Sequence, residues 1–190
     1  IGTTTQPIAV FIDTNYLKTL PVKQIRNGLA EIIKYGIIAD QKLFKFIEQN
    51  LNKIFAHEEK AINYIIKRSV EIKVKIIEED EKEKGKRMLL NYGHTYGHAL
   101  ERLSGYTLLH GYAISIGMVI INDIAIKKKL LKKAEAERIK KLLKNTELPT
   151  TTMRTPTLKD IASDKKREGD YINLVFPTKI GHAIILKEKL

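Results

Sequence analysis

The 190-residue chain has no cysteine, no tryptophan and no apolar run near the length of a membrane span. Without cysteine it can form neither disulfides nor Cys-ligated zinc fingers, a composition that fits a reducing, cytoplasmic compartment. A transmembrane helix needs roughly 20 consecutive apolar residues, so we expect no association with a membrane. The first residues lack the pattern of a secretory signal peptide, and the chain begins at Ile1 without a methionine. We expect it to be a segment of a longer protein.

Several motifs with a known mechanism are also missing. The chain contains no Gly-x-Gly-x-x-Gly and no Gly-x-x-x-x-Gly-Lys-Ser/Thr, the two common loops that hold nucleotide phosphates. It contains no Gly-x-Ser-x-Gly turn, on which a nucleophilic serine is exposed, and no reactive thiol. We therefore expect no nucleophilic catalysis, and we assign no cofactor-binding residue to this chain.

Basic residues are in excess, with a formal net charge of +12. Nine Lys or Arg and two Glu lie between Lys127 and Lys144, among leucines and isoleucines at helical spacing. This pattern predicts an amphipathic helix with a basic, solvated face. A nucleic-acid surface is the alternative, but no aromatic residue is interleaved there to stack on bases. We expect no nucleic-acid partner, while an anionic small molecule would benefit from the positive field.

Hydrophobic periodicity predicts a mainly α, multihelical fold with strands only near its two ends. The apolar run 7–13 ends in a turn-prone Asp-Thr-Asn and predicts a short, buried N-terminal strand. Two apolar segments, 172–176 and 183–186, are separated by Pro177 and Gly181 and predict a C-terminal β-hairpin. Helices are predicted over 22–39, 41–49, 58–80, 87–103, 110–130 and 133–145.

Histidines are the residues that point most directly to chemistry. Three of the five, His94, His98 and His110, fall within seventeen positions. On a helix His94 and His98 would share one face, and neutral imidazole is a good ligand for a divalent metal. Capped or buried structural histidines next to small glycines are the alternative. Three histidines together with a carboxylate favour a metal or acid–base site.

The helix predicted over 22–39 carries a candidate carboxylate. Glu31 and Lys34 lie in Gly28–Gly36, where nearly all their neighbours are apolar. A buried charge needs a partner, because an uncompensated one costs several kcal/mol or more. A simple i,i+3 ion pair explains the two residues equally well. If Glu31 joined the histidines, the set would offer three protein ligands and an open position, which is typical of catalytic zinc.

A polar stripe precedes the histidines. Arg87 lies four residues before Asn91, and Asn91 lies three residues before His94, so one helix face would carry all of them. A guanidinium and a carboxamide beside imidazoles suit an oxyanionic substrate. The cluster Asp164–Arg167, which includes Lys165 and Lys166, could add phosphate contacts, although a charged turn before a strand is the simpler interpretation.

Taken in order, these motifs resemble 3-dehydroquinate synthase, over about residues 1 to 185. The similarity is to the helical C-terminal half of that family, and the family's N-terminal, NAD-binding half is absent from this chain. Residues 1–13 are then the end of that missing α/β domain, including its last strand, and 14–190 form the helical metal- and substrate-binding domain. The matching motifs are Ile12–Asp13, Leu17–Pro21, Gly28–Gly36, Glu71–Lys73, Asp80–Glu83, Arg87–His98, Leu109–Gly111 and Ile116–Met118.

The resemblance implies a shikimate-pathway reaction in aromatic amino acid biosynthesis. DAHP, a seven-carbon keto-acid phosphate, becomes 3-dehydroquinate with loss of phosphate, while bound NAD transiently oxidises one hydroxyl. It implies zinc, or Co²⁺, held by Glu31, His94 and His110, and His98 as an acid–base or hydrogen-bonding partner. Lys34, Lys73, Arg87, Asn91 and one of Lys165 and Lys166 would hold the carboxylate and phosphate. It also implies a cytoplasmic homodimer at full length, and an isolated chain that is inactive.

The family pattern changes one conclusion drawn from spacing, because helical geometry nominates His94 and His98 as joint ligands and the family nominates His110 instead. One departure is visible at Tyr112, where the family usually has an acidic residue, so a contact that supports the metal ligand His110 is in question. Two enzyme alternatives are another sugar-phosphate cyclase and a metal-dependent polyol dehydrogenase of the same fold. A basic helical module that binds nucleic acid or a protein partner is the non-enzyme alternative.

Overall fold

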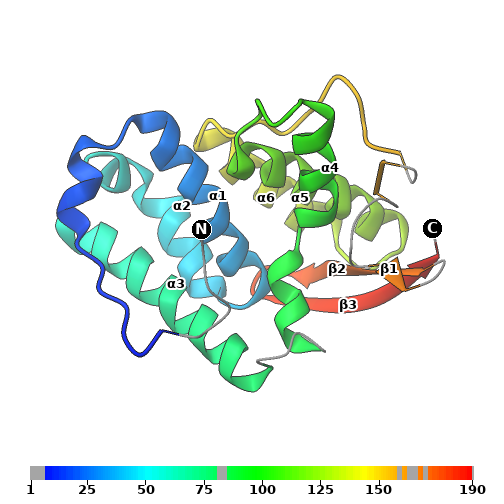
Figure 1. Cartoon of the computed structure of the whole chain (residues 1–190), viewed down its shortest axis with the longest axis horizontal. Helices are drawn as coiled ribbons and strands as arrows, with labels where there is room; N and C mark the ends of the chain where they lie inside the picture. The colour runs from blue at the N-terminus through cyan, green and yellow to red at the C-terminus, as the bar shows by residue number, and fades with distance from the viewer. Residues whose placement is uncertain (1–6, 81–84, 158–159, 162–166, 169–170, 190) are drawn as a thin grey trace.

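The computed structural model describes residues 7–80, 85–157, 160–161, 167–168 and 171–189. It confirms a mainly helical fold with a small C-terminal sheet (Figure 1). α1, α2 and α3 form one side of the molecule, and α4, α5 and α6 the other. The helices are η1 (Thr14–Thr19), α1 (Val22–Ile38), α2 (Gln41–Phe55), α3 (Glu59–Glu79), η2 (Lys86–Asn91), α4 (His94–Leu103), α5 (His110–Lys127) and α6 (Lys133–Asn145).

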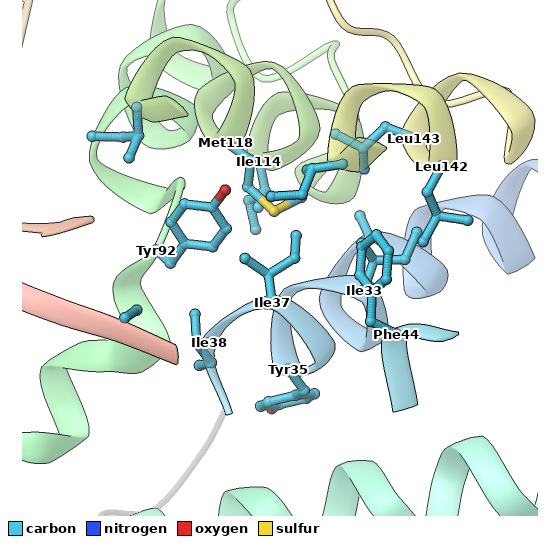
Figure 2. Packing of buried hydrophobic residues seen from close by; sticks show 14 of the residues in the cluster. Ile33, Tyr35, Ile37, Ile38, Phe44, Tyr92, Ile114, Met118, Leu142 and Leu143 are labelled. Atoms are coloured by element: carbon cyan, nitrogen blue, oxygen red, sulfur yellow. The ribbon is translucent and has the colours of Figure 1, made fainter. Parts of the chain in front are cut away.

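Two helices, α1 and α5, run through the centre and touch each other. α5 is buried on most of its faces, and the second half of α1, from Ile33 to Ile38, is completely buried. Figure 2 shows Ile37 of α1 facing Met118 of α5, while Ile33 lies beside Phe44 of α2. Each fully buried Ile or Met side chain contributes about 1.5–3 kcal/mol. The two most apolar helices of the sequence therefore form the frame of the core.

Glycines allow the helices around this frame to come unusually close. A Cβ added at Gly111, in the first turn of α5, would lie 2.0 Å from the Asn27 carbonyl oxygen of α1. The Asn27 side chain also accepts a hydrogen bond of 2.6 Å from the Gly111 N–H. At Gly117, a Cβ would lie 2.1 Å from the Gly93 carbonyl oxygen, just before α4. Glycine at these positions brings the starts of α4 and α5 and the middle of α1 together.

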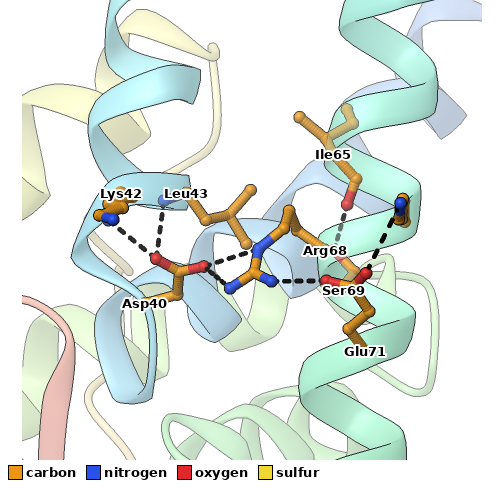
Figure 3. Close-up of polar contacts among 8 residues, drawn as sticks. Asp40, Lys42, Leu43, Ile65, Arg68, Ser69 and Glu71 are labelled. Atoms are coloured by element: carbon orange, nitrogen blue, oxygen red, sulfur yellow. Dashed lines mark hydrogen bonds and ion pairs between the residues drawn. The ribbon is translucent and has the colours of Figure 1, made fainter.

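One aspartate, between α1 and α2, joins α2 to α3. Asp40 begins α2, and its Oδ1 accepts hydrogen bonds from the N–H groups of Lys42 and Leu43 at 2.9 and 3.1 Å. Its Oδ2 accepts two more from the Arg68 guanidinium of α3, at 3.0 and 2.6 Å, as Figure 3 shows. A single buried carboxylate thus caps one helix and ties it to another.

The predicted C-terminal hairpin is confirmed. β2 (Tyr171–Lys179) and β3 (His182–Lys189) pair antiparallel, and β1 (Arg167–Glu168) adds a short third strand in the order β1-β2-β3. The turn residue Gly181 adopts a positive φ of 90° and donates a hydrogen bond of 2.8 Å to the Ile37 carbonyl. The hairpin therefore covers the C-terminal end of α1.

The structure corrects two predicted elements. Residues 7–13 form no strand, and Ile8 and Phe11 are almost fully exposed. A strand needs a hydrogen-bonded neighbour, and none lies beside these residues in the described part of the chain. The single helix predicted over 87–103 is wrong as well. It is divided into η2 and α4 at Tyr92 and Gly93, where Gly93 takes a left-handed φ of 78°. The other five predicted helices are confirmed, and α2 extends six residues further than expected.

None of the helices in the described ranges combines the length and apolarity that a membrane span requires.

Candidate metal and anion site

Two imidazoles and one carboxylate converge where α1, α4 and α5 meet. Glu31 lies in the middle of α1, and His94 and His110 are the first residues of α4 and α5. The Nε2 atoms of His94 and His110 lie 3.3 and 3.6 Å from Oε1 of Glu31. In the described part of the chain, this set offers three ligand atoms within 4.8 Å of one another. Residues far apart in sequence thus assemble the set that the family resemblance implied.

The second nitrogen of each imidazole is held by an acceptor. His94 Nδ1 lies 3.1 Å from the Tyr92 carbonyl oxygen, and His110 Nδ1 lies 3.1 Å from Oε1 of Glu101. Carbonyl and carboxylate oxygens only accept hydrogen bonds, so we assign the proton to Nδ1 in both rings. In both, Nε2 then presents its lone pair toward Glu31, the tautomer that a metal ligand requires.

Glu31 also forms the i,i+3 ion pair considered from the sequence, but in a buried position. Lys34 is only 3% exposed, and its Nζ lies 2.6 Å from Oε2 of Glu31. Burial acts to raise the pKa of Glu31, but the neighbouring His110 and His94 and the charge of Lys34 outweigh it and hold that pKa far below its usual range. Glu31, followed by Glu101, raises the pKa of His110. Glu31 is therefore ionised at neutral pH.

These residues fit a divalent metal. Glu31 Oε1 is buried and makes no hydrogen bond in the described structure, although two imidazole nitrogens stand beside it. Ligand atoms about 2 Å from a tetrahedral ion lie roughly 3.3–3.5 Å apart, close to the separations found here. A cation bound by all three side chains would satisfy this orphaned oxygen. One carboxylate with two imidazoles is also a donor set that zinc commonly takes.

A cation-lined cavity opens next to the three ligands. It measures about 260 Å³ and is lined by Glu31, Lys34, Tyr35, Lys73, Arg87, Leu90, Asn91 and His94. Burial, followed by the charge of Glu31, raises the pKa of Tyr35 to about 12, so its phenol stays protonated. Every substrate-binding residue predicted outside 158–166, except His98, lines this cavity. Three cationic side chains here favour an anionic ligand.

Arg87 and Asn91 reach the cavity differently from the way their spacing predicted. They belong to η2, so they share no continuous helix face with His94 and His98. The carboxylate of Asp80 accepts hydrogen bonds from the N–H groups of Gly85 and Arg87, at 2.8 and 2.9 Å, and holds the start of η2. The break at Tyr92 and Gly93 ends η2 and starts α4, and residues of both helices line the same cavity.

His98 lies beside the metal-ligand set. Its ring centroid is 5.5 Å from that of His94 and 6.0 Å from that of His110. With Glu101 and His110, it forms the second group in the described residues whose ligand atoms all lie within 4.8 Å. Spacing alone nominated His94 and His98 as joint ligands, but His94 is grouped with Glu31 and His110 instead. Lys165 and Lys166 lie outside the described residues.

Sequence reasoning missed two residues at the site. Glu101 was not considered, although it follows His94 by seven residues and His98 by three, the spacing of one helix face. Asn27, which holds the start of α5 through Gly111, carried no recognisable signal, because its role depends on how α1 crosses α5. The sequence put in question whether an acidic side chain contacts His110, because position 112 is a tyrosine. Glu101, on the neighbouring helix α4, makes such a contact.

The fold and the site define a helical domain in which a carboxylate and two imidazoles converge in a set that could hold a metal, beside a cavity lined by cationic side chains. A family profile described as 3-dehydroquinate synthase C-terminal matches residues 28–167. This match covers most of the chain and includes all three ligands. The chain belongs to the 3-dehydroquinate synthase C-terminal family.

Curated relatives agree with this assignment. A 3-dehydroquinate synthase from Prochlorococcus marinus is 44% identical over 99% of this chain and 53% of its own length. One from Aliivibrio fischeri is 41% identical over 98% of the chain and 53% of its length. The chain therefore spans about half the length of the curated relatives it matches.

Solved structures share the fold. A 2-epi-5-epi-valiolone synthase from Streptomyces hygroscopicus, with NAD⁺ and Zn²⁺ bound, superposes with a TM-score of 0.85 at 26% identity over 94% of this chain and 51% of that one. A 2-deoxy-scyllo-inosose synthase superposes with a TM-score of 0.79 at 24% identity, over 93% of this chain and 52% of that one. At that identity the second similarity concerns the fold alone.

Proposed function

We propose that this chain is the metal- and substrate-binding half of a 3-dehydroquinate synthase, which converts DAHP to 3-dehydroquinate and phosphate with NAD and a divalent metal. The observation that carries the proposal is the convergence of Glu31, His94 and His110 beside the cavity lined by Lys34, Lys73 and Arg87. The name of relatives 41–44% identical to the chain supports it.

The cavity supports binding of a doubly anionic substrate. DAHP carries a carboxylate and a phosphate, and the cavity brings two lysines and an arginine together. The guanidinium of Arg87 can hold either anion through two parallel hydrogen bonds, whereas Lys73 offers a mobile point charge. Lys34 is already paired with Glu31, so it links the substrate cavity to the metal ligands. Asn91 can both donate and accept a hydrogen bond at a substrate hydroxyl.

Proton transfer is assigned to His98. Its imidazole stands next to the ligand set without belonging to the group of Glu31, His94 and His110, which suits the acid–base or hydrogen-bonding role that the family resemblance implies. Zinc or Co²⁺, held by Glu31, His94 and His110, would act as a Lewis acid on a substrate hydroxyl. The half-exposed His110 leaves the ligand set open to a small molecule.

The rest of the protein enters the proposal through the resemblance. The NAD-binding α/β domain would be the other half of the curated relatives' length, with residues 1–13 as the end of that domain and 14–190 as the helical domain. We extend the proposal to a cytoplasmic homodimer of the complete protein, as the family resemblance implies.

A related sugar-phosphate cyclase is the second candidate, because a 2-epi-5-epi-valiolone synthase shares the fold at a TM-score of 0.85. The higher identity to 3-dehydroquinate synthases, 44% against 26%, favours the first candidate. A polyol dehydrogenase would use the cation-lined cavity less well, since its substrates carry no phosphate or carboxylate.

The test is an activity assay on a chimera that joins the N-terminal half of the Prochlorococcus marinus relative to this chain. We expect phosphate release from DAHP and formation of 3-dehydroquinate, dependent on both NAD and zinc. A chimera that cyclises a sugar phosphate without a carboxylate and leaves DAHP unchanged would support the second candidate. A chimera that binds zinc and NAD but turns over neither compound would contradict the proposal.

A further inference from the structure

Glu101 is the carboxylate whose contact has no role in the function proposed so far. It lies on α4, seven residues after His94 and three after His98, so the three side chains share a helix face. Its Oε1 accepts the Nδ1 hydrogen bond of His110 at 3.1 Å, and the Glu101 side chain is only 16% exposed. A carboxylate on α4 thus contacts a metal ligand that belongs to α5.

The two histidine ligands differ in how firmly their surroundings hold them. His94 is 12% exposed, and a backbone carbonyl two residues earlier fixes its ring. His110 is 43% exposed, and it is the first residue of α5. Packing restricts the rotamers of a half-exposed side chain less than those of a buried one, so the hydrogen bond to Glu101 adds a restraint that this ring needs more than His94 does.

We propose that Glu101 is a positioning residue that orients His110 as a metal ligand, an inference that rests on the proposed function. By accepting the Nδ1 proton, Glu101 directs Nε2 toward Oε1 of Glu31, which lies 3.6 Å away. A carboxylate behind an imidazole also makes that imidazole a stronger donor to the metal. α4 would then supply a ligand, the acid–base histidine and the support for the third ligand.

Glu101 could instead bind a metal directly, since His98, Glu101 and His110 form a second group of close ligand atoms. In that arrangement His110 would use Nδ1, the nitrogen that faces Glu101, and Nε2 would be withdrawn from the Glu31 set. The two arrangements predict different ligands, so the absorption spectrum of bound Co²⁺ distinguishes them.

The experiment measures the affinity of this chain for Zn²⁺ by calorimetry with a competing chelator, together with the absorption spectrum of the Co²⁺ form. We expect Glu101→Ala to weaken zinc binding about 10–100-fold, with one ion per chain at saturation and an unchanged Co²⁺ spectrum. Glu101→Gln keeps the acceptor oxygen without the charge, so it should recover part of the loss. The matched control is Glu48→Ala, which removes a partly exposed carboxylate on α2 that is paired with Arg138, outside the groups of possible metal ligands.

Three results would overturn the inference. One is zinc affinity in Glu101→Ala within about twofold of the parent, and another is an equal loss in Glu48→Ala, which would indicate a general loss of stability. The third is a changed Co²⁺ spectrum at saturation, which would make Glu101 a ligand. If the parent chain bound no zinc, the proposed metal site itself would fail, so the two failures are distinguishable.

Discussion

At the scale of the residue, Glu31 shows how one side chain serves two parts of the site. Its Oε2 pairs with buried Lys34, which lines the anion cavity, while Oε1 faces the imidazoles of His94 and His110. A carboxylate beside a buried lysine and two imidazoles stays ionised in spite of its burial. The metal and the anionic substrate would therefore influence each other through Glu31.

Arg87 is the residue whose replacement tests the anion cavity. Arg87→Lys keeps the charge but loses the planar fork, so in the chimera we expect KM to rise or kcat to fall about 10–100-fold, the equivalent of losing a hydrogen bond to a charged group. Thermal stability should change by less than about 0.5 kcal/mol. Steady-state kinetics and a thermal melt check both. Unchanged kinetics would mean that Arg87 only stabilises the η2 region.

Individual site residues were predictable from the sequence to different degrees. The family motif nominated Glu31, His94 and His110, which the structure brings together, whereas helical spacing alone would have joined His94 to His98. Glu101 was within reach of a spacing argument, because it repeats the face of His94 and His98. The pairing of Glu101 with His110 depends on how α4 packs against α5, which no local pattern encodes.

At the scale of the element, the start of α5 is positioned by its contact with α1. Gly111→Ala would place a Cβ 2.0 Å from the Asn27 carbonyl oxygen, so the helices must separate. We expect a loss of about 1–3 kcal/mol in the free energy of unfolding and a weaker metal site, because His110 precedes this residue. Gly28→Ala, exposed on α1 with nothing within 4 Å, is the matched control and should gain about 0.5–1 kcal/mol. Urea unfolding and zinc titration of both variants check this, and equal behaviour would contradict it.

The connection between α2 and α3 predicts a pH dependence. Burial acts to raise the pKa of Asp40, but hydrogen bonds from Arg68 and from the N–H groups of α2 lower it overall. Because its pKa is lower in the folded than in the unfolded protein, the ionised carboxylate stabilises the fold at pH values above the unfolded-state pKa near 3.8. This contribution is lost as the pH falls through the pKa of the folded state. Asp40→Asn keeps the cap, so it should cost about 1 kcal/mol at pH 7 and progressively less below pH 4. Urea unfolding between pH 3 and 7 measures this, and a cost independent of pH would contradict the role of the ion pair.

Helices with a strong apolar period were predicted well, whereas the break between η2 and α4 and the absence of an N-terminal strand were not. α1, α3, α5 and α6 begin and end within about three residues of the prediction, because their apolar positions repeat with the helical period. The break before α4 was missed, since the apolar pattern continues through Gly93 and only the positive φ of that residue interrupts the helix. The strand predicted over 7–13 failed because strand formation depends on a partner that the pattern does not reveal.

At the scale of the whole molecule, the chain brings Glu31, His94 and His110 together beside a cation-lined cavity, and its sequence contains neither of the two common phosphate-loop motifs. We expect it alone to bind NAD more weakly than the micromolar range and to show no turnover of DAHP. Calorimetric titration of the chain with NAD, beside the chimera as a positive control, checks this. A dissociation constant of about 1–10 µM for the chain alone would contradict the two-domain account.

Metal stoichiometry tests the central claim most directly, namely that Glu31, His94 and His110 hold one divalent ion and His98 does not. Elemental analysis after zinc reconstitution and dialysis would be applied to the parent chain, His110→Ala, His98→Ala and, as a control, His182→Ala on the distant hairpin. We predict one zinc per chain for the parent, His98→Ala and His182→Ala, and only trace zinc for His110→Ala. Trace zinc in the parent, or equal zinc contents in His98→Ala and His110→Ala, would contradict the account.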